Sequence, residues 1–164
     1  MREWLVASGI IEGPDGVLLV QNKRRNGALD WSTPGGVIEV ADGESVIDGL
    51  TREVREETGI TVTRWRGPVY EVEAEAAGMG WRLRVEVHQA LEFSGDLVLE
   101  DLDEIVVDAR WVHHEACGPH LEACPVWVRE PLAAYLAERW PDEAPSFRYR
   151  VEGADRANMT VVRL

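Results

Sequence analysis

One segment of this chain constrains its fold more than any other, an amphipathic helix predicted from Ser45 to Thr58. Glu44 and Ser45 are typical of a helix start, and Gly59 is typical of the left-handed residue that follows a helix end. At about 100° per residue, one stripe of this helix is apolar and is expected to be buried. The residues of that stripe are Val46, Ile47, Leu50 and Val54. Such a helix needs a second layer to cover its apolar stripe.

The segments around this helix are rich in β-forming residues, and turn signals separate them. Strands are predicted at Trp4–Ile11, Val17–Val20, Ile60–Trp65, Val69–Ala76, Trp81–Phe93 and Ile105–Val112. The turn signal at residues 13–16 predicts that the first two strands form a hairpin. A second helix is predicted at Val126–Trp140, and a C-terminal hairpin within residues 147–164. Mixed strands with two helices predict an α/β or α+β sandwich.

Length and charge narrow the classes of protein that this chain can represent. The 164 residues suit one compact domain, spanning residues 1–164. The net charge is 17 − 30 = −13, so binding to a nucleic-acid backbone by general electrostatics is not expected. A small anion can still bind to so acidic a chain if a metal cation intervenes.

Cysteine usage and hydropathy predict where the protein resides. Two cysteines are too few for a disulfide framework and fit a reducing compartment. No signal peptide is visible, and no apolar run approaches the roughly 20 residues that span a membrane. The sequence therefore predicts a cytoplasmic protein with no membrane partner.

Three carboxylates crowd one flank of the predicted helix, beside its apolar stripe. Glu53, Glu56 and Glu57 lie within one turn of one another, whereas Arg52 is expected on the solvent side. Like charges at this spacing repel one another, and partial burial raises the cost. Oxygen ligands of this kind suit a hard divalent cation, although a solvated acidic helix face has the same pattern. Gly49, one turn before Glu53, suggests close approach of another group to the helix.

The same residues resemble the signature of the Nudix hydrolase family. That signature places a Glu, seven residues and then Arg-Glu-x-x-Glu-Glu before a glycine, and Glu44 and Arg52 to Ile60 match it without a gap. Pro34-Gly35-Gly36 also resembles the usual entry to the signature. Ile38 stands where the signature has glycine, so the loop of residues 37–43 is two residues longer than usual. The resemblance implies a Nudix-type α/β/α sandwich with a mixed sheet and a signature segment at residues 36–60.

The resemblance also implies a metal site and its supporting residues. Carried over position by position, the ligands of Mg²⁺, with Mn²⁺ as a substitute, are Glu53, Glu56, Glu57 and the backbone carbonyl of Gly36. Arg52 matches the arginine that orients the glutamates, and Glu44 matches a glutamate that is usually structural and sometimes assists. A further carboxylate often comes from a later loop. Of the candidates Glu100, Asp101, Asp103 and Glu104, the last is favoured because it directly precedes a strand.

The implied activity is magnesium-dependent cleavage of the diphosphate linkage in a small-molecule nucleotide. Markers of several substrate classes are absent, which leaves nucleoside triphosphates or a less common nucleoside diphosphate derivative. Arg24 and Arg25 are candidates for phosphate contacts, and Trp31 for stacking on a base. The alternative is a catalytically inactive Nudix-fold module that binds or senses nucleotides. The general base and the choice between monomer and homodimer stay open.

A cluster of histidines and cysteines after the last predicted strand has a second interpretation. Zinc-capable side chains gather there at His113, His114, Cys117, His120 and Cys124. Their spacing follows none of the standard zinc patterns, and glycine and proline interrupt it. Local structure with incidental histidines is therefore favoured over a zinc site.

Overall fold

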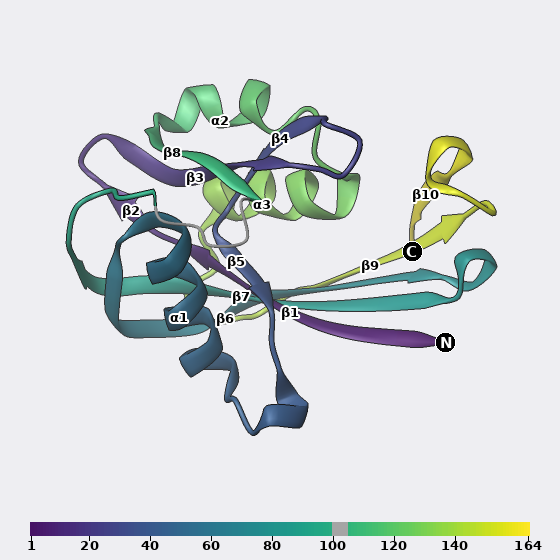
Figure 1. The fold of residues 1–164 in the computed structure, drawn as a ribbon, viewed down its shortest axis with the longest axis horizontal. Helices are drawn as coiled ribbons and strands as arrows, with labels where there is room; N and C mark the ends of the chain where they lie inside the picture. Colours follow the sequence, from purple (N-terminus) through teal and green to yellow (C-terminus); the bar gives the residue numbers. More distant parts are fainter. Residues whose placement is uncertain (100–104) are drawn as a thin grey trace.

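A computed structural model describes residues 1–99 and 105–164, and two β-sheets with helices on both sides make up this part of the chain (Figure 1). The larger sheet has six strands, and it is mixed because β1 runs parallel to β7 and β6 runs parallel to β9. In spatial order its strands are β10 (Thr160–Arg163), β9 (Ser146–Glu152), β6 (Thr61–Ala76), β7 (Trp81–Ser94), β1 (Arg2–Ile10) and β5 (Gly35–Val37).

The smaller sheet is antiparallel and is centred on β3. Its four strands are β2 (Glu12–Gly13), β3 (Gly16–Lys23), β4 (Leu29–Ser32) and β8 (Val106–Val112). The predicted opening hairpin is wrong, because β1 and β3 belong to different sheets. β4 and β8 occupy the two edges of β3, while β5 and β7 occupy those of β1. Only the two residues of β2 form a tight hairpin with β3.

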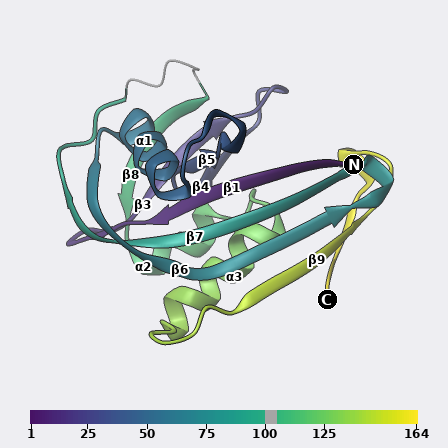
Figure 2. The same cartoon turned by 90° about the horizontal axis from the view of Figure 1, so that it is seen from below.

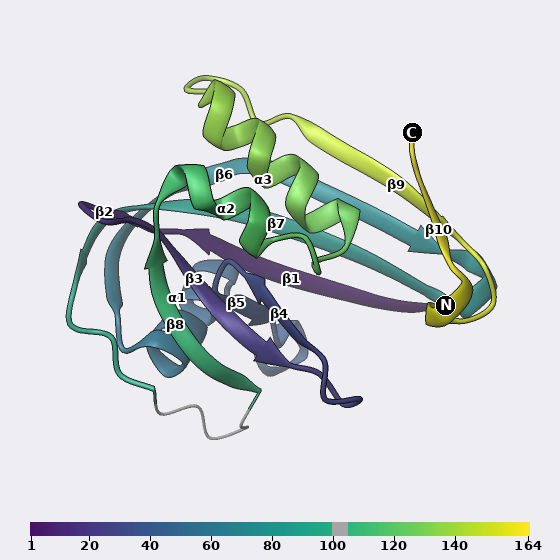
Figure 3. The same ribbon diagram turned by 90° about the horizontal axis from the view of Figure 1, so that it is seen from above.

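The three α-helices of the described residues lie on opposite sides of this β-structure. α1 (Val46–Thr58) covers one side, whereas α2 (His114–His120) and α3 (Val126–Glu138) cover the other (Figures 2 and 3). Consecutive residues of β3 pack into different hydrophobic clusters. Leu18 belongs to the cluster with α1, and Leu19 belongs to the cluster with α2 and α3. Burial on both faces explains the continuous apolar run at this strand. The predicted α/β/α sandwich with a mixed sheet is thus confirmed.

Several element boundaries differ from those predicted. The two strands expected between residues 60 and 76 are one strand, β6, whose register against β7 shifts between Arg66 and Tyr70. Helix α2 was not predicted, since Gly118 and Pro119 lie within it. α3 ends at Glu138, and the next residue, Arg139, adopts φ 53° and forms an ion pair with Glu12. At the C-terminus, β9 pairs with β6 and β10 pairs with β9. None of the helices in the described chain combines the length and apolar character that a membrane crossing needs.

A buried histidine on β7 is expected to make the stability of the fold depend on pH. The side chain of His88 is almost fully buried, and its Nε2 lies 3.3 Å from Glu86 Oε1. Its Nδ1 is buried without a hydrogen-bond partner in residues 1–99 and 105–164. A Cβ atom on Gly67 would lie 2.6 Å from that nitrogen, so the Gly67 backbone packs closely against the imidazole ring. Burial therefore lowers the pKa of His88 below its usual 6.5.

We expect acid to destabilise the folded state through His88. Below about pH 6.5 the unfolded chain binds a proton that the folded chain does not, so stability falls as the pH drops from the unfolded pKa towards the lowered folded pKa. Each pH unit in this window costs at most about 1.4 kcal/mol. Urea unfolding at about pH 8 and about pH 5.5 measures the difference. His88→Gln should lose less stability between the two pH values than the wild type, and equal losses would contradict the assignment.

Candidate active site

Local sequence positions the helix that carries the glutamates. The Ser45 hydroxyl accepts a hydrogen bond from the Asp48 N–H at 3.1 Å, which caps the start of α1. Gly59, at φ 82°, donates its N–H to the Arg55 carbonyl and ends the helix. The predicted start and end of the helix are confirmed. One residue of the predicted apolar stripe is misplaced: Ile47 is exposed, whereas its neighbour Val46 packs against the cluster that holds Leu50 and Val54.

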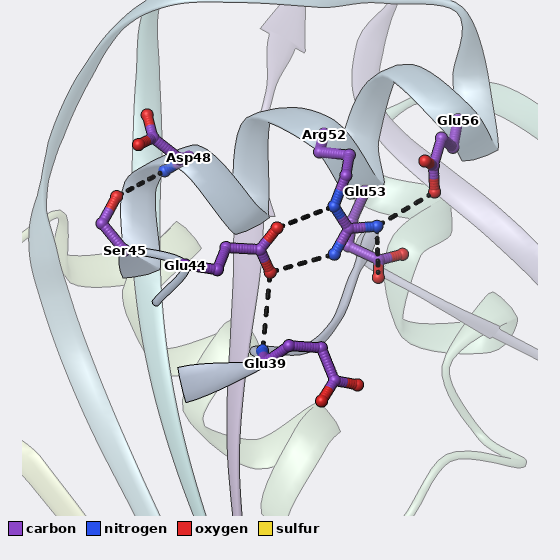
Figure 4. A network of polar contacts seen from close by, with 7 residues as sticks. All are labelled: Glu39, Glu44, Ser45, Asp48, Arg52, Glu53 and Glu56. Atoms are coloured by element: carbon purple, nitrogen blue, oxygen red, sulfur yellow. Dashed lines mark hydrogen bonds and ion pairs between the residues drawn. The ribbon is translucent and has the colours of Figure 1, made fainter. Parts of the chain in front are cut away.

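Arg52 is the centre of a polar network on α1 (Figure 4). Its Nε and Nη2 donate to the two carboxylate oxygens of Glu44 at 2.8 and 3.0 Å. Its Nη1 donates to Glu53 at 3.2 Å and to Glu56 at 3.1 Å. The helical wheel predicted Arg52 on the solvent side, but its long side chain folds back over the flank. Because Arg52 binds Glu44, the pKa of the Glu44 carboxyl is lowered.

Two glycines allow this network to form. A Cβ atom on Gly49 would lie 2.7 Å from Glu44 Oε1 and 2.7 Å from Ile38 Cδ1. Glu44 and Ile38 can therefore pack against α1 at this position only because residue 49 has no side chain. This is the close approach that the glycine within the helix predicted. Gly43, at φ 78°, ends the short 3₁₀ turn Val40–Asp42 that accommodates the lengthened loop.

Glu53 and Glu57 both face the Gly35–Gly36 segment. Gly35 donates its N–H to Glu57 Oε2 at 3.2 Å. A Cβ atom on Gly36 would lie 2.8 Å from the carboxyl carbon of Glu53, so that carboxylate packs directly on the glycine backbone. Burial of Glu53 raises its pKa, and the negative charge of Glu56 adds to the effect, although Arg52 opposes it. Glu56 is exposed and lies towards solvent.

The donor set of this flank fits a hard divalent cation. Carboxylates and a neighbouring backbone segment without side chains supply the oxygen ligands that such ions prefer. In residues 1–99 and 105–164, no group of three or more His, Cys, Asp or Glu residues is already gathered closely enough to hold a metal. In the His113–Cys124 segment, both cysteines are buried, whereas His113 and His114 are exposed. Since Arg52 draws Glu53 and Glu56 to itself, a bound cation would have to compete with its guanidinium. Glu104, with the other candidates of the acidic loop, lies outside the described residues.

A cavity of about 230 Å³ opens beside the Gly35–Gly36 segment. Its apolar lining comes from β6, β7 and α3, and includes Tyr70, Val85 and Trp127. Its polar lining comes from β1, β3 and the segment after β4, and includes Ser8, Asn22 and Thr33. These residues were not predicted, because they belong to segments that are far apart in sequence.

Arg24 forms the polar edge of this cavity together with buried neighbours. Its Nε and Nη2 bind the Asp30 carboxylate at 2.6 and 2.8 Å. Asn22 donates to the same carboxylate at 3.0 Å and to the Ser32 hydroxyl at 2.9 Å. Arg24 Nη1 has no hydrogen-bond partner among the residues that the structure describes, so its protons are available to a ligand.

The other two predicted substrate contacts lie elsewhere. Arg25 is exposed on the loop after β3 and does not line the cavity. Trp31 packs away from it, edge-on to His120 with 5.4 Å between ring centroids, and beneath the Arg110 guanidinium at 5.7 Å. β4 points the Trp31 ring towards α2, because the alternate residues Asp30 and Ser32 face Asn22. Trp127 of α3 is the tryptophan that lines the cavity.

Comparison with known proteins agrees with this arrangement. Residues 3–134 match the sequence profile of the NUDIX domain. A segment of 57 residues, 35% of this chain, is 46% identical to the uncharacterized Nudix hydrolase YvcI of Bacillus subtilis and covers 33% of that protein. The chain thus matches about a third of the length of this curated relative.

Solved structures share the fold. The E. coli ORF135 protein superposes with a TM-score of 0.66 at 25% identity, over 87% of this chain and 96% of its own. The MutT protein from Bacillus halodurans superposes with a TM-score of 0.66 at 20% identity, over 98% and 97% of the two chains, which shows the fold alone. Members of this family hydrolyse acid anhydrides that contain phosphorus and generally use divalent metal cations. By its profile match over residues 3–134 and its signature helix, the chain belongs to the Nudix hydrolase family.

Proposed function

We propose that this protein is a magnesium-dependent hydrolase that cleaves the diphosphate linkage of a nucleoside diphosphate derivative, with nucleoside triphosphates as the first candidates. One observation carries the proposal: Glu53 and Glu57 face the Gly35–Gly36 backbone beside a 230 Å³ cavity. This arrangement supports a site for metal-bound phosphates at the glutamates and a site for the nucleoside in the neighbouring cavity. The acidic flank and the mixed cavity lining suit the two ends of one such substrate.

The residues proposed to hold Mg²⁺, with Mn²⁺ as a substitute, are Glu53, Glu56, Glu57 and the Gly36 carbonyl, with Glu104 as a further candidate. When bound, the cation neutralises phosphate charge and lowers the pKa of an attacking water. Glu53 and Glu57 would be held towards the Gly35–Gly36 backbone by packing and by the Gly35 N–H. A carboxylate of this set would accept the proton of the water. Arg52 and Glu44 would keep the glutamates in position.

The cavity supports a nucleoside moiety more than a small inorganic anion. Tyr70, Val85 and Trp127 give it an apolar lining that suits a planar base or a sugar. Arg24, prevented from reorienting by Asp30, offers the unpaired Nη1 donors at the edge. Arg24 is therefore kept as a substrate-binding candidate, whereas the positions of Trp31 and Arg25 do not favour direct contact with a ligand in this cavity.

Turnover of a nucleotide panel is the direct test. With Mg²⁺ present, we expect release of pyrophosphate or phosphate from at least one nucleoside triphosphate or diphosphate derivative, and none in excess EDTA. Product analysis by ion-exchange chromatography would show which phosphate bond breaks. Full turnover in excess chelator would contradict the metal assignment. Nucleotide binding by calorimetry without turnover of any panel member would instead favour the inactive sensor module.

Other properties stay predictions from the sequence. These are the cytoplasmic location, the monomeric or homodimeric state, the absence of nucleic-acid partners, and the organisation of residues 1–164 as a single domain.

A further inference from the structure

A tryptophan outside the signature contacts the signature helix at its middle. Trp65 lies on β6, and its indole Nε1 donates a hydrogen bond to Thr51 Oγ1 on α1 at 3.0 Å. Both side chains are partly buried, and Trp65 packs against the hydrophobic cluster that holds Leu50 and Val54. The indole N–H is thus a directional contact within an otherwise apolar interface.

The same ring also sits against β1, the strand that pairs with the Gly35–Gly36 segment of β5. A Cβ atom on Gly9 of β1 would lie 2.7 Å from Trp65 Cη2, so the ring occupies the space of the missing side chain. Gly9 donates its N–H to the Pro34 carbonyl at 2.9 Å, directly before Gly35 and Gly36. Trp65 therefore contacts two elements that border the proposed metal site. One is α1, which carries the glutamates, and the other is β1, which holds the segment with Gly35 and Gly36.

Thr51 and the glutamates lie on opposite sides of the buried stripe of α1. At 100° per residue, Thr51 is about 160° from Glu53 around the helix axis, and Leu50 and Val54 fall between them. The helix is thus held against rotation at two points, by Trp65 on one side and by Gly35 and Gly36 on the other. Side chains reach about 5–6 Å from a helix axis, so a rotation of about 10° moves a carboxylate by roughly 1 Å. Displacements of that size matter at reactive sites.

We propose that Trp65 is a positioning residue that sets the rotation of α1, and hence the places of Glu53 and Glu57, through its hydrogen bond to Thr51. The inference rests on the proposed function, because it assumes that these glutamates bind a metal. The indole N–H, and not only the bulk of the ring, carries the role. Removing either partner of the bond should therefore weaken metal binding more than it weakens the fold.

The test compares Thr51→Val, Trp65→Phe and the double variant with the wild type. Mn²⁺ affinity is measured without substrate by calorimetry, the half-activating Mg²⁺ concentration is measured in turnover, and melting is measured in EDTA. We expect each single variant to raise the Mn²⁺ Kd and the half-activating Mg²⁺ concentration by about 10-fold, at the lower end of the loss typical for contacts that support metal ligands. The double variant should bind Mn²⁺ no more weakly than the weaker-binding single variant, since the two substitutions remove the same hydrogen bond.

Matched variants separate positioning from general damage. Thr51→Ser keeps the hydroxyl and should restore metal affinity to within about twofold of the wild type, because a hydrogen bond is retained. Thr63→Val and Trp4→Phe make the same chemical changes at exposed positions and should leave metal affinity unchanged.

Three results would overturn the inference. The first is unchanged Mn²⁺ affinity in Thr51→Val and Trp65→Phe while the wild type binds Mn²⁺, which would leave the proposed function standing. The second is a loss of Mn²⁺ affinity that is additive in the double variant and parallels the fall in melting temperature in EDTA, which would make Trp65 a packing residue only. The third is a wild type that neither binds Mn²⁺ nor turns over nucleotides, which would overturn the proposed function as well.

Discussion

Replacing Glu53 by glutamine is expected to lower turnover by about 10²–10³-fold, because glutamine keeps the shape of the side chain and removes the charge that would hold the cation. Metal ions supply several kcal/mol of charge stabilisation to such reactions, and each 1.4 kcal/mol corresponds to a factor of ten in rate. Glu53 is chosen because its carboxylate packs on Gly36 and is the carboxylate whose pKa burial raises. Steady-state kinetics over a range of Mg²⁺ concentrations measures the loss.

Melting curves for the same variant distinguish a metal ligand from a structural residue. In EDTA, Glu53→Gln should melt at the wild-type temperature or above it, since the change removes a partly buried charge. With excess Mg²⁺ the order should reverse, because a ligand that binds only the folded state stabilises it, by about 2.7 kcal/mol at 100 times Kd. Glu143→Gln removes an exposed carboxylate and serves as the control. A destabilised Glu53→Gln that gains as much from Mg²⁺ as the wild type would show Glu53 to be structural.

Arg52→Ala is expected to lower metal affinity and turnover by about 10–100-fold, the usual effect of losing a residue that orients metal ligands. In contrast to Glu53→Gln, it should also lower the melting temperature in EDTA. The change leaves three carboxylates, Glu44, Glu53 and Glu56, without the guanidinium that they share. Their mutual repulsion then adds to the net negative charge of the chain.

Two further variants test the geometry of Arg52. Arg55→Ala removes a cation of the same helix, exposed and without an ion pair in the described part of the chain, and should have little effect on turnover. Arg52→Lys should recover only part of the activity, because a single ammonium group cannot reproduce the fork that binds Glu44 with two nitrogens. Near wild-type kinetics of Arg52→Ala at limiting Mg²⁺ would count against the orienting role.

The signature helix shows how much a sequence alone can determine. Ser45 and Gly59 set its ends through hydrogen bonds to residues within four positions, and the 3.6-residue period sets its buried stripe. Both are local effects, so they could be predicted without knowing any partner. The resemblance of Arg52 to Ile60 to a known signature then supplied the candidate chemistry of the flank. Gly49 was recognised as a place of close approach, although the sequence did not show that Glu44 and Ile38 approach there.

Strand partners could not be predicted in the same way. Alternating polarity and β-branched residues predict that β1 and β3 are strands, but they do not predict which strands pair with either edge. Their separation into two sheets follows from long-range pairing with β7 and β8. The same limit applies to Trp31, whose position beside the glycines in sequence suggested a ligand contact. The pleat of β4 turns its ring towards His120 instead.

The sequence by itself determined the helix, its carboxylate flank and the glycines that face it, because short-range caps, periodicity and a contiguous signature encode them. Only the tertiary structure decided which residues line the cavity beside the flank, where Ser8, Asn22 and Trp127 come together from three separate elements. It also decided that Trp65, whose ring packs on Gly9, donates a hydrogen bond to Thr51 on the other side of the helix. Contacts between distant segments depend on how whole layers pack, and no local pattern records that packing.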